Sequence, residues 1–287
     1  MEDKEIILLL RRAVETLERI SPPPPEQTNF EASNAFVWHA NTQLLETVKT
    51  INSVDFHLLK GIKQQQKVLL ENTTRFAKGL PANNVLLWGA RGTGKSSLVK
   101  ATHAEVNNSI KHPLILVEIH RDDLLSLPAL LKAVRKTKRR VLIFCDDLSF
   151  DNQDNSYKSL KTILEGGIEE KPSNVIFYAT SNRRHLMPRE MIENEQSSSI
   201  YPSEAIEEKV SLSDRFGLWL GFHNIDQKTY LDIVDSYADY FNLGAGEVDI
   251  HAEANEWAIT RGSRSGRVAW QFTQDLAGRL GKKLKKP

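Results

Sequence analysis

Five short apolar runs divide the middle of the chain. They are bounded by polar or turn residues and are separated by stretches of helix length. Runs of this kind, alternating with helices, are typical of buried parallel strands in βα units. The pattern therefore predicts an α/β fold with a parallel sheet of five strands: Val85–Trp88, Leu114–Ile119, Val141–Cys145, Val175–Ala179 and Leu218–Phe222.

Helical periodicity prevails before and after these strands. Between Phe30 and Ala77 the apolar residues recur mostly at helical spacing and predict a helical region that precedes the sheet. After the last strand we expect three helices, beginning with one capped by Asp226 and followed by helices near Ala252–Thr260 and Arg267–Leu280. This pattern predicts an N-terminal helical region (1–55), an α/β domain (56–223) and a helical lid with a basic tail (224–287).

The first twenty residues carry an amphipathic pattern of their own. Apolar residues such as Ile6, Leu10 and Leu17 form one stripe on an otherwise charged helix. Four prolines, Pro22–Pro25, cannot continue that helix and favour a stiff extended spacer. Two interpretations stay open: the helix packs on its own domain, or it binds a partner or another copy of the chain.

Charge and composition narrow the function classes. Lys and Arg number 38 against 37 Asp and Glu, so the net charge of +1 provides no global attraction for nucleic acids or acidic membranes. A nucleic-acid contact would have to be local, at the basic runs Arg135–Arg140 or Lys282–Lys286, and such runs are usually solvated.

Neither export nor membrane insertion is expected. The N-terminus has Glu2 and Asp3 where an export signal would be basic. No stretch approaches the roughly 20 apolar residues of a membrane helix. The single cysteine, Cys145, lies in an apolar run and is interpreted as part of the core. We therefore expect a soluble, cytoplasmic protein with no membrane association.

A phosphate-binding loop follows the first predicted strand. The segment Gly89–Ser96 fits the pattern G-x-x-x-x-G-K-[ST] and leads into a predicted helix. Glycines let backbone N–H groups converge on phosphate oxygens, and the helix N-terminus adds its dipole. Lys95 would reach the β and γ phosphates, and the Ser96 hydroxyl would hold Mg²⁺. The candidate nucleotide-binding residues are Gly89, Ala90, Arg91, Gly92, Thr93, Gly94, Lys95, Ser96 and Ser97.

Polar side chains follow two later strands. The run Val141–Cys145 ends in Asp146 and Asp147, at the sheet edge where open α/β folds bind ligands. Asp146 suits a Mg²⁺ ligand, and Asp147 could act as a general base that polarises the attacking water. Asn182 follows another strand and would project beside these acids if the two strands are neighbours.

An arginine would stabilise the charge of a transferring phosphoryl group. The candidates by position are Arg183, Arg184, Arg215, Arg264 and Arg267, and spacing alone does not choose among them.

The order of these parts, over roughly Leu58–Leu280, resembles the AAA+ ATPases. The resemblance implies a P-loop NTPase with strand order 5-1-4-3-2, with ATP and Mg²⁺ as cofactors and a homo-oligomer as the expected assembly. The phrases Asn83–Ser97, Asp146–Phe150 and Ala179–Leu186 are most similar to an uncharacterised bacterial family of predicted AAA+ ATPases, for which no substrate or client is assigned.

The resemblance also implies roles for single residues. Leu59, Gly61, Ile62 and Gln65 are similar to the segment that lines the adenine pocket, so Gly61 and Ile62 join the cofactor-binding candidates. Asn182 takes the role of the first sensor. Asp214–Gly217 resembles the arginine-finger segment of the Holliday-junction branch-migration motor, which makes Arg215 a finger offered to a neighbouring subunit. Gly266–Ala269 resembles the lid motif that senses the γ-phosphate, through Arg267 with Arg264 in reserve.

Two departures from the AAA+ pattern affect function. The superfamily usually has Asp-Glu after the acid strand, whereas this chain has Asp146 and Asp147. Hydrolysis is therefore expected to be slow or to depend on assembly. Residues 120–123 lead from a strand almost directly into a helix with no aromatic-Gly loop, which makes a protein unfoldase a poor fit.

Three functions fit these residues. The first is an oligomeric Mg²⁺-dependent ATPase that controls the assembly or remodelling of an unknown protein client. The second is a nucleotide-gated switch or scaffold with little hydrolysis. The third is a helicase-loader-like, nucleic-acid-associated ATPase, supported only by the two basic runs.

Overall fold

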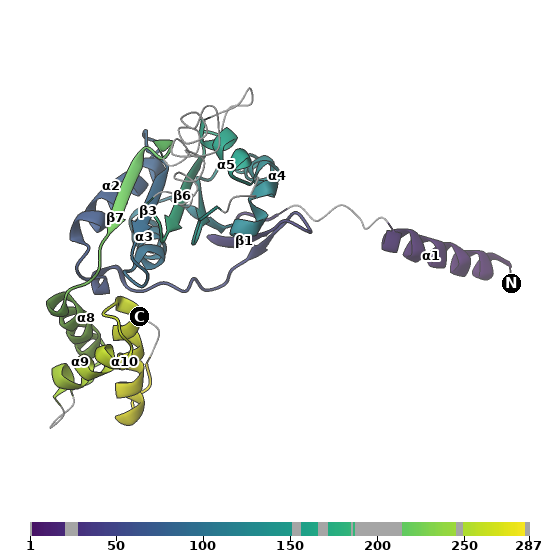
Figure 1. Ribbon diagram of the computed structural model, residues 1–287. Helices are drawn as coiled ribbons and strands as arrows, with labels where there is room; N and C mark the ends of the chain where they lie inside the picture. Colours follow the sequence, from purple (N-terminus) through teal and green to yellow (C-terminus); the bar gives the residue numbers. More distant parts are fainter. Residues whose placement is uncertain are drawn as a thin grey trace, which may run out of the picture.

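The computed structural model describes residues 2–20, 28–150, 156–165, 172–184, 186, 214–244 and 249–284. The proline spacer Pro22–Pro25 lies outside them. A mixed sheet of seven strands, in the order β2-β1-β4-β5-β6-β3-β7, forms the centre of the α/β part (Figure 1).

All five predicted strands are present and parallel. Within the larger sheet they are adjacent in the order β7-β3-β6-β5-β4, which is 5-1-4-3-2 when they are numbered along the chain. The prediction of a sheet with five strands is wrong, because two more strands extend it beside β4. The bounds of the five are β3 (Val85–Gly89), β4 (Ile115–Glu118), β5 (Val141–Cys145), β6 (Val175–Ser181) and β7 (Leu218–Phe222).

The two additional strands correct the prediction of a helical region at 30–77. Strand β1 (Ala35–His39) is parallel to β4, and β2 (Leu44–Thr47) is antiparallel to β1. The sequence Phe-Val-Trp in β1 is aromatic and β-branched, as strands prefer, and Gln43 with φ 52° allows the tight reversal before β2. Helical residues within this region are confined to η1 (Phe56–Leu58) and α2 (Lys63–Ala77).

Alternate residues of the strands form two cores, one on each face of the sheet. One face packs against α2 and α3 (Lys95–Ser109). The opposite face packs against η2 (Arg121–Ser126), α4 (Leu127–Val134) and α5 (Ser156–Glu165). Figure 1 shows the sheet between these helices. Cys145 is fully buried in the second core, as expected for a structural thiol, and burial raises its pKa.

Three further helices form a bundle with its own core, beside the sheet (Figure 1). They are α8 (Gln227–Tyr240), α9 (Ile250–Thr260) and α10 (Gly266–Arg279), close to the predicted bounds. Each begins at a residue whose side chain accepts a hydrogen bond from a backbone N–H of the first turn: Asp226, Asp249 and Ser265. We refer to this bundle as the lid.

The N-terminal helix α1 (Glu2–Ile20) extends away from the other elements (Figure 1). Its apolar side chains are exposed, with 59% of Leu10 and 63% of Leu17 accessible to solvent. The stripe is therefore not packed on the chain's own domain in this structure. Among the described helices, α1 included, none is both long and apolar enough to cross a membrane.

A buried histidine links α3 to the sheet and makes stability depend on pH. His103 is 1% exposed, and its Nε2 lies 2.8 Å from the Leu114 carbonyl oxygen. The backbone carbonyls of Leu114 and Asn34 favour the protonated imidazole, but they do not offset the cost of burying its charge. Burial, reinforced by the charge of Arg139, lowers the pKa of His103 from 6.5 to about 4.

We predict that the free energy of unfolding decreases as pH falls from 6.5 to about 4. In that interval the unfolded chain binds a proton at His103 and the folded chain does not, so the loss is about 1.4 kcal/mol per pH unit from this group. The measurement is urea unfolding at a series of pH values. The free energy of unfolding should depend less on pH in His103→Gln. Its pH dependence should be unchanged in His112→Gln, a variant at an exposed site. Equal slopes for His103→Gln and wild type would contradict the prediction.

Candidate nucleotide-binding site

The polar residues predicted from the sequence meet at the carboxyl edge of three adjacent strands. Strand β6 lies between β5 and β3. Cys145 of β5 is opposite Ala179 of β6, and Trp88 of β3 is opposite Ser181. The residues that follow each strand are therefore neighbours, and the phosphate loop lies beside them.

The loop Gly89–Gly94 folds tightly around the side chain of Lys95. Gly89, Gly92 and Gly94 have φ values of 133°, 74° and 92°, a region that L side chains rarely adopt. The Lys95 ammonium donates to the carbonyl oxygens of Gly89 at 2.9 Å and of Ala90 at 2.7 Å. The Thr93 hydroxyl also donates to the Ala90 carbonyl, at 2.8 Å. These bonds define the conformation of the loop at the N-terminus of α3.

Lys95 also contacts the predicted sensor residue. Its ammonium donates to Asn182 Oδ1 at 3.2 Å, so the three donors of the ammonium have three oxygen acceptors. Burial lowers the pKa of Lys95; the charges of Asp146 and Asp147 oppose that shift. Cationic Arg91 and Arg267 add to the lowering, so positive charges from the loop and the lid act together on Lys95. Such a concentration of positive charge suits a polyanionic ligand.

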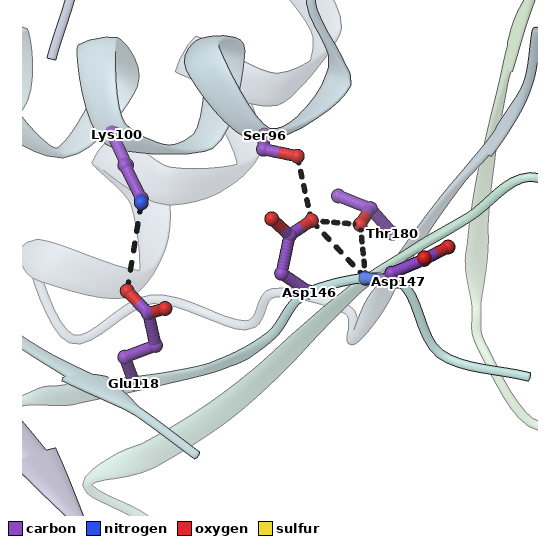
Figure 2. A network of polar contacts seen from close by, with 6 residues as sticks. All are labelled: Ser96, Lys100, Glu118, Asp146, Asp147 and Thr180. Atoms are coloured by element: carbon purple, nitrogen blue, oxygen red, sulfur yellow. Dashed lines mark hydrogen bonds and ion pairs between the residues drawn. The ribbon is translucent and has the colours of Figure 1, made fainter. Parts of the chain in front are cut away.

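Ser96 and the acid pair form the second half of the site. Figure 2 shows Ser96, Asp146, Thr180 and Asp147 linked in one network. The Ser96 hydroxyl donates to Asp146 Oδ1 at 2.6 Å, and the Thr180 hydroxyl donates to the same oxygen. The Lys100–Glu118 ion pair in the same view, with 3.5 Å between its atoms, is a separate contact between α3 and β4.

Asp147 adopts an unusual backbone conformation. Its φ is 52°, in the left-handed region that non-glycine residues seldom occupy, although Asp and Asn tolerate it best. From this turn its carboxylate accepts a hydrogen bond from Asn182 Nδ2 at 2.5 Å. Asn182 therefore bridges Asp147 and Lys95, and the sequence expectation of an amide beside the acids agrees with the geometry.

The oxygens at this edge fit a magnesium ion. Mg²⁺ is usually held by one or two protein oxygens together with phosphate oxygens and water. The Ser96 hydroxyl and the Asp146 carboxylate provide two adjacent oxygens. In the described part of the chain, no cluster of three or more His, Cys, Asp or Glu residues could hold a metal ion. The donor set therefore suits a cation that binds together with a nucleotide.

Apolar residues lie on the other side of the loop. A Cβ built on Gly94 would be 3.8 Å from both Ile62 and Leu59, so these side chains border the start of α3. Gly61, with φ 77°, is so close to α8 that any Cβ would collide with Thr229. The segment expected to contact adenine therefore lies between the phosphate loop and the lid.

The lid contacts the phosphate loop directly. The Gly266 N–H donates to the Gly92 carbonyl oxygen at 2.9 Å. Ser265, which caps α10 by accepting from the Val268 N–H, is 5% exposed and lies against Gly92. Arg267 follows in the first turn of α10, and its Cβ would be 3.6 Å from a Cβ on Gly92. The N-terminus of α10 is therefore part of the candidate site.

Comparisons with known proteins agree with this architecture. A family model described as "Protein of unknown function (DUF815)" matches residues 31–280. The chain belongs to the DUF815 family. Helix α1 lies outside the matched residues. A comparison with curated proteins gave no match.

The fold of this DUF815 protein is similar to that of solved structures with which it shares little sequence identity. Orc1 of Aeropyrum pernix, solved in complex with DNA, has a TM-score of 0.55 at 15% identity, over 80% of this chain and 66% of that one. This chain thus spans slightly less than two thirds of Orc1, and the similarity establishes a shared fold alone. Two other structures are less similar. Orc2 of A. pernix in ADPNP-ADP complexes has a TM-score of 0.46 at 14% identity, over 77% of this chain and 72% of that one. A RuvB variant of Thermotoga maritima has a TM-score of 0.45 at 13% identity, over 81% of this chain and 86% of that one.

Arg215 of the DUF815 chain lies at the opposite edge of the sheet. It precedes β7, which is parallel to β3 with Leu218 opposite Val85. The next residues contact the start of β3, since a Cβ on Gly217 would be 2.5 Å from Asn83 Oδ1. The five residues of β3 advance by about 3.3 Å each toward the phosphate loop. Arg215 is therefore remote from the phosphate loop of its own chain.

The other arginines differ in position. Arg264 and Arg267 are exposed on the lid, and only Arg267 lies in α10. Arg183 and Arg184 follow β6, on the same edge as the site. The Arg184 guanidinium lies 5.4 Å from the centre of the Trp88 ring, an arrangement typical of cation–π contacts.

The basic run Arg135–Arg140 has structural contacts. Arg139 donates to the carbonyl oxygen of Pro113 at 3.1 and 3.0 Å. Arg140 donates to the Ser173 carbonyl at 3.1 Å and lies 5.1 Å from the centre of the Phe76 ring. Two guanidinium groups of this run therefore bind the protein itself. The last two residues of the other run, Lys282–Lys286, lie outside the described residues.

Sequence reasoning gave no role to two residues of the site, Thr180 and Ser265. Thr180 lies in β6, two residues before Asn182, which follows the strand, so continued extended backbone would place the two side chains on one face. That periodicity could have identified it. Ser265 immediately precedes the predicted lid motif, and its capping position was open to the same reasoning as Asp226.

We predict that Gly92→Ala destabilises the protein more than Gly262→Ala does. Both glycines have positive φ, 74° and 61°, but a Cβ on Gly92 would be 2.9 Å from Ser265 Oγ, whereas no described atom lies within 4 Å of one on Gly262. Displacing the Ser265 cap should cost about 1 kcal/mol beyond the backbone effect shared by both variants. Urea unfolding followed by tryptophan fluorescence measures the difference. An equal loss of unfolding free energy in the two variants would show that the contact between Ser265 and Gly92 does not affect stability.

Proposed function

We propose that this protein binds ATP with Mg²⁺ and hydrolyses it. The observation that carries the proposal is the hydrogen-bonded chain in which Lys95 contacts Asn182, Asn182 contacts Asp147, and Ser96 contacts Asp146. These residues come from three segments, and their types are those that phosphoryl transfer requires. The AAA+ fold supports the same reaction class.

Each residue has a distinct role in this proposal. The loop amides and Lys95 bind the phosphates, because Lys95 is held beside the loop and is surrounded by other cations. Ser96 and Asp146 hold Mg²⁺, which neutralises phosphate charge. Asp147 accepts a hydrogen bond from the attacking water and polarises it, and Asn182 orients that carboxylate. Gly61 and Ile62 border the adenine, and Arg267 acts on the γ-phosphate from the lid.

The proposal includes an assembly in which neighbouring copies share sites. Arg215 is remote from its own phosphate loop, so any contact it makes with a phosphate would be at the site of another chain. A head-to-tail contact between copies would bring this edge of one sheet toward the loop of the next, as in heterologous interfaces that close into rings. Nucleotide state would then control the assembly and, through it, a protein client.

A nucleic-acid partner is not part of the proposal. Arg139 and Arg140 of the central basic run bind carbonyl oxygens of the protein, which removes the best local reason for such a partner.

We predict that Arg215→Ala reduces steady-state ATP hydrolysis by about 10³-fold or more while ATP binding persists. Specific activity of the wild type should increase with protein concentration, since each active site needs two chains. Lys95→Ala serves as the variant that lacks phosphate binding. Hydrolysis is measured by phosphate release, and binding by titration with a fluorescent ATP analogue.

Mixing the two inactive variants gives the sharpest test of shared sites. The Arg215→Ala chain keeps Lys95, and the Lys95→Ala chain keeps Arg215. A site formed by the loop of the first chain and the arginine of the second therefore contains both residues. Mixtures should therefore recover part of the wild-type activity, although neither variant has it alone. Activity of Arg215→Ala equal to wild type would refute the shared site. Tight ATP binding without turnover at any concentration would instead identify a nucleotide-gated switch, the second function that the sequence allows.

A further inference from the structure

Thr180 occupies the centre of the site. It lies in β6, between the acid strand β5 and the phosphate-loop strand β3, and is 1% exposed. Because Cys145 is opposite Ala179, the next residue of each strand, Asp146 and Thr180, are side by side. Its other neighbour across the sheet is Leu87 of β3.

The Thr180 hydroxyl makes one bond to each acid. It donates to Asp146 Oδ1, the same oxygen that accepts from Ser96. It also accepts from the backbone N–H of Asp147 at 2.9 Å. A hydroxyl has one donor and two acceptor positions, so the single Oγ1 atom can make both bonds.

The bond to Asp147 has a conformational consequence. The left-handed backbone of Asp147 is unfavourable for a residue with a side chain and persists only where its surroundings impose it. Its N–H is held by Thr180 Oγ1 and, at 3.1 Å, by Asp146 Oδ1. Both acceptors belong to one network, and Thr180 orients the second acceptor as well. The direction in which the Asp147 carboxylate leaves the backbone therefore depends on this hydroxyl.

We propose that Thr180 is a positioning residue for both acids: its hydroxyl orients the Asp146 carboxylate toward the cation position and holds Asp147 in the left-handed turn that directs its carboxylate to Asn182. This inference rests on the proposed ATPase function for its catalytic consequence. Its structural part does not, because the two hydrogen bonds exist without nucleotide.

If Thr180 contributed only to packing of the core, its hydroxyl would not be required. Valine has nearly the shape of threonine and an equal preference for strands, so packing alone would be preserved in Thr180→Val. A positioning role predicts that Thr180→Val changes the conformation of the two acids. Thr180→Ser keeps the hydroxyl and should leave that conformation unchanged. Thr102→Val is the matched control, since Thr102 is fully buried and its hydroxyl has no hydrogen-bond partner among the described residues.

The first measurement needs no nucleotide. Amide hydrogen exchange of Asp147, followed by NMR on the full chain, should be about fivefold faster in Thr180→Val than in wild type, because one acceptor is lost. Thr180→Ser and Thr102→Val should match the wild type. Unchanged exchange in Thr180→Val would overturn the proposal whether or not the protein is an ATPase. If Thr180→Val does not fold, Thr180→Ala replaces it in the same comparison.

The second measurement separates the inference from the proposed function. Mn²⁺ affinity in the presence of a non-hydrolysable ATP analogue, and kcat for ATP, should each fall by about 10- to 100-fold in Thr180→Val, as for residues that orient metal ligands. Affinity for the analogue without metal should not change, and Thr180→Ser should restore both values. A wild type without turnover defeats the ATPase proposal, while the exchange result still decides the role of Thr180. A wild type with turnover and an equally active Thr180→Val defeats the role of Thr180 alone.

Discussion

The candidate site depends on the placement of β6 between β5 and β3. Parallel pairing fixes the register, with Cys145 opposite Ala179 and Trp88 opposite Ser181. That register brings the end of the acid strand, Asn182 and the loop Gly89–Gly94 to one edge of the sheet. A shift of one residue would reverse the faces of Thr180 and Asn182 and direct both away from α3. Burial of both faces of β6 in the two cores makes such a shift costly.

Contacts from the lid also restrict the conformation of the phosphate loop and of the segment at Gly61. Two glycines of the candidate site, Gly61 and Gly92, approach lid residues so closely that neither position leaves room for a side chain. The contacts come from different helices, Thr229 in α8 and Ser265 before α10, while the lid has its own core. Since the Gly266 N–H binds the Gly92 carbonyl, a change in the loop backbone is transmitted to α10.

The sequence was sufficient for the parts of the fold with strong periodicity or a motif. The apolar runs predicted five strands because they are apolar and mostly buried, and the cap Asp226 marks the start of α8. The hairpin β1–β2 was missed because β2 is largely exposed, and the apolar residues downstream of the hairpin recur at helical spacing. The convergence of Lys95, Asp146 and Asn182 followed from strand order. The left-handed turn at Asp147 and the contact of Ser265 with Gly92 arise from tertiary structure, which no local pattern encodes.

The conformation of Asp147 gives a physical reason for an aspartate where the AAA+ pattern usually has glutamate. A backbone with φ 52° is tolerated by Asp better than by Glu, because a short polar side chain can be satisfied locally. Here Asn182 Nδ2 binds the carboxylate at 2.5 Å, and Asn182 in turn accepts from Lys95. A side chain longer by one methylene would have to move Asn182 or leave the left-handed turn, and either change would disturb Lys95 or Thr180. The shorter acid, its left-handed turn and the side chains of Thr180 and Asn182 therefore form one consistent arrangement, in which Asp147 is not simply a shortened glutamate.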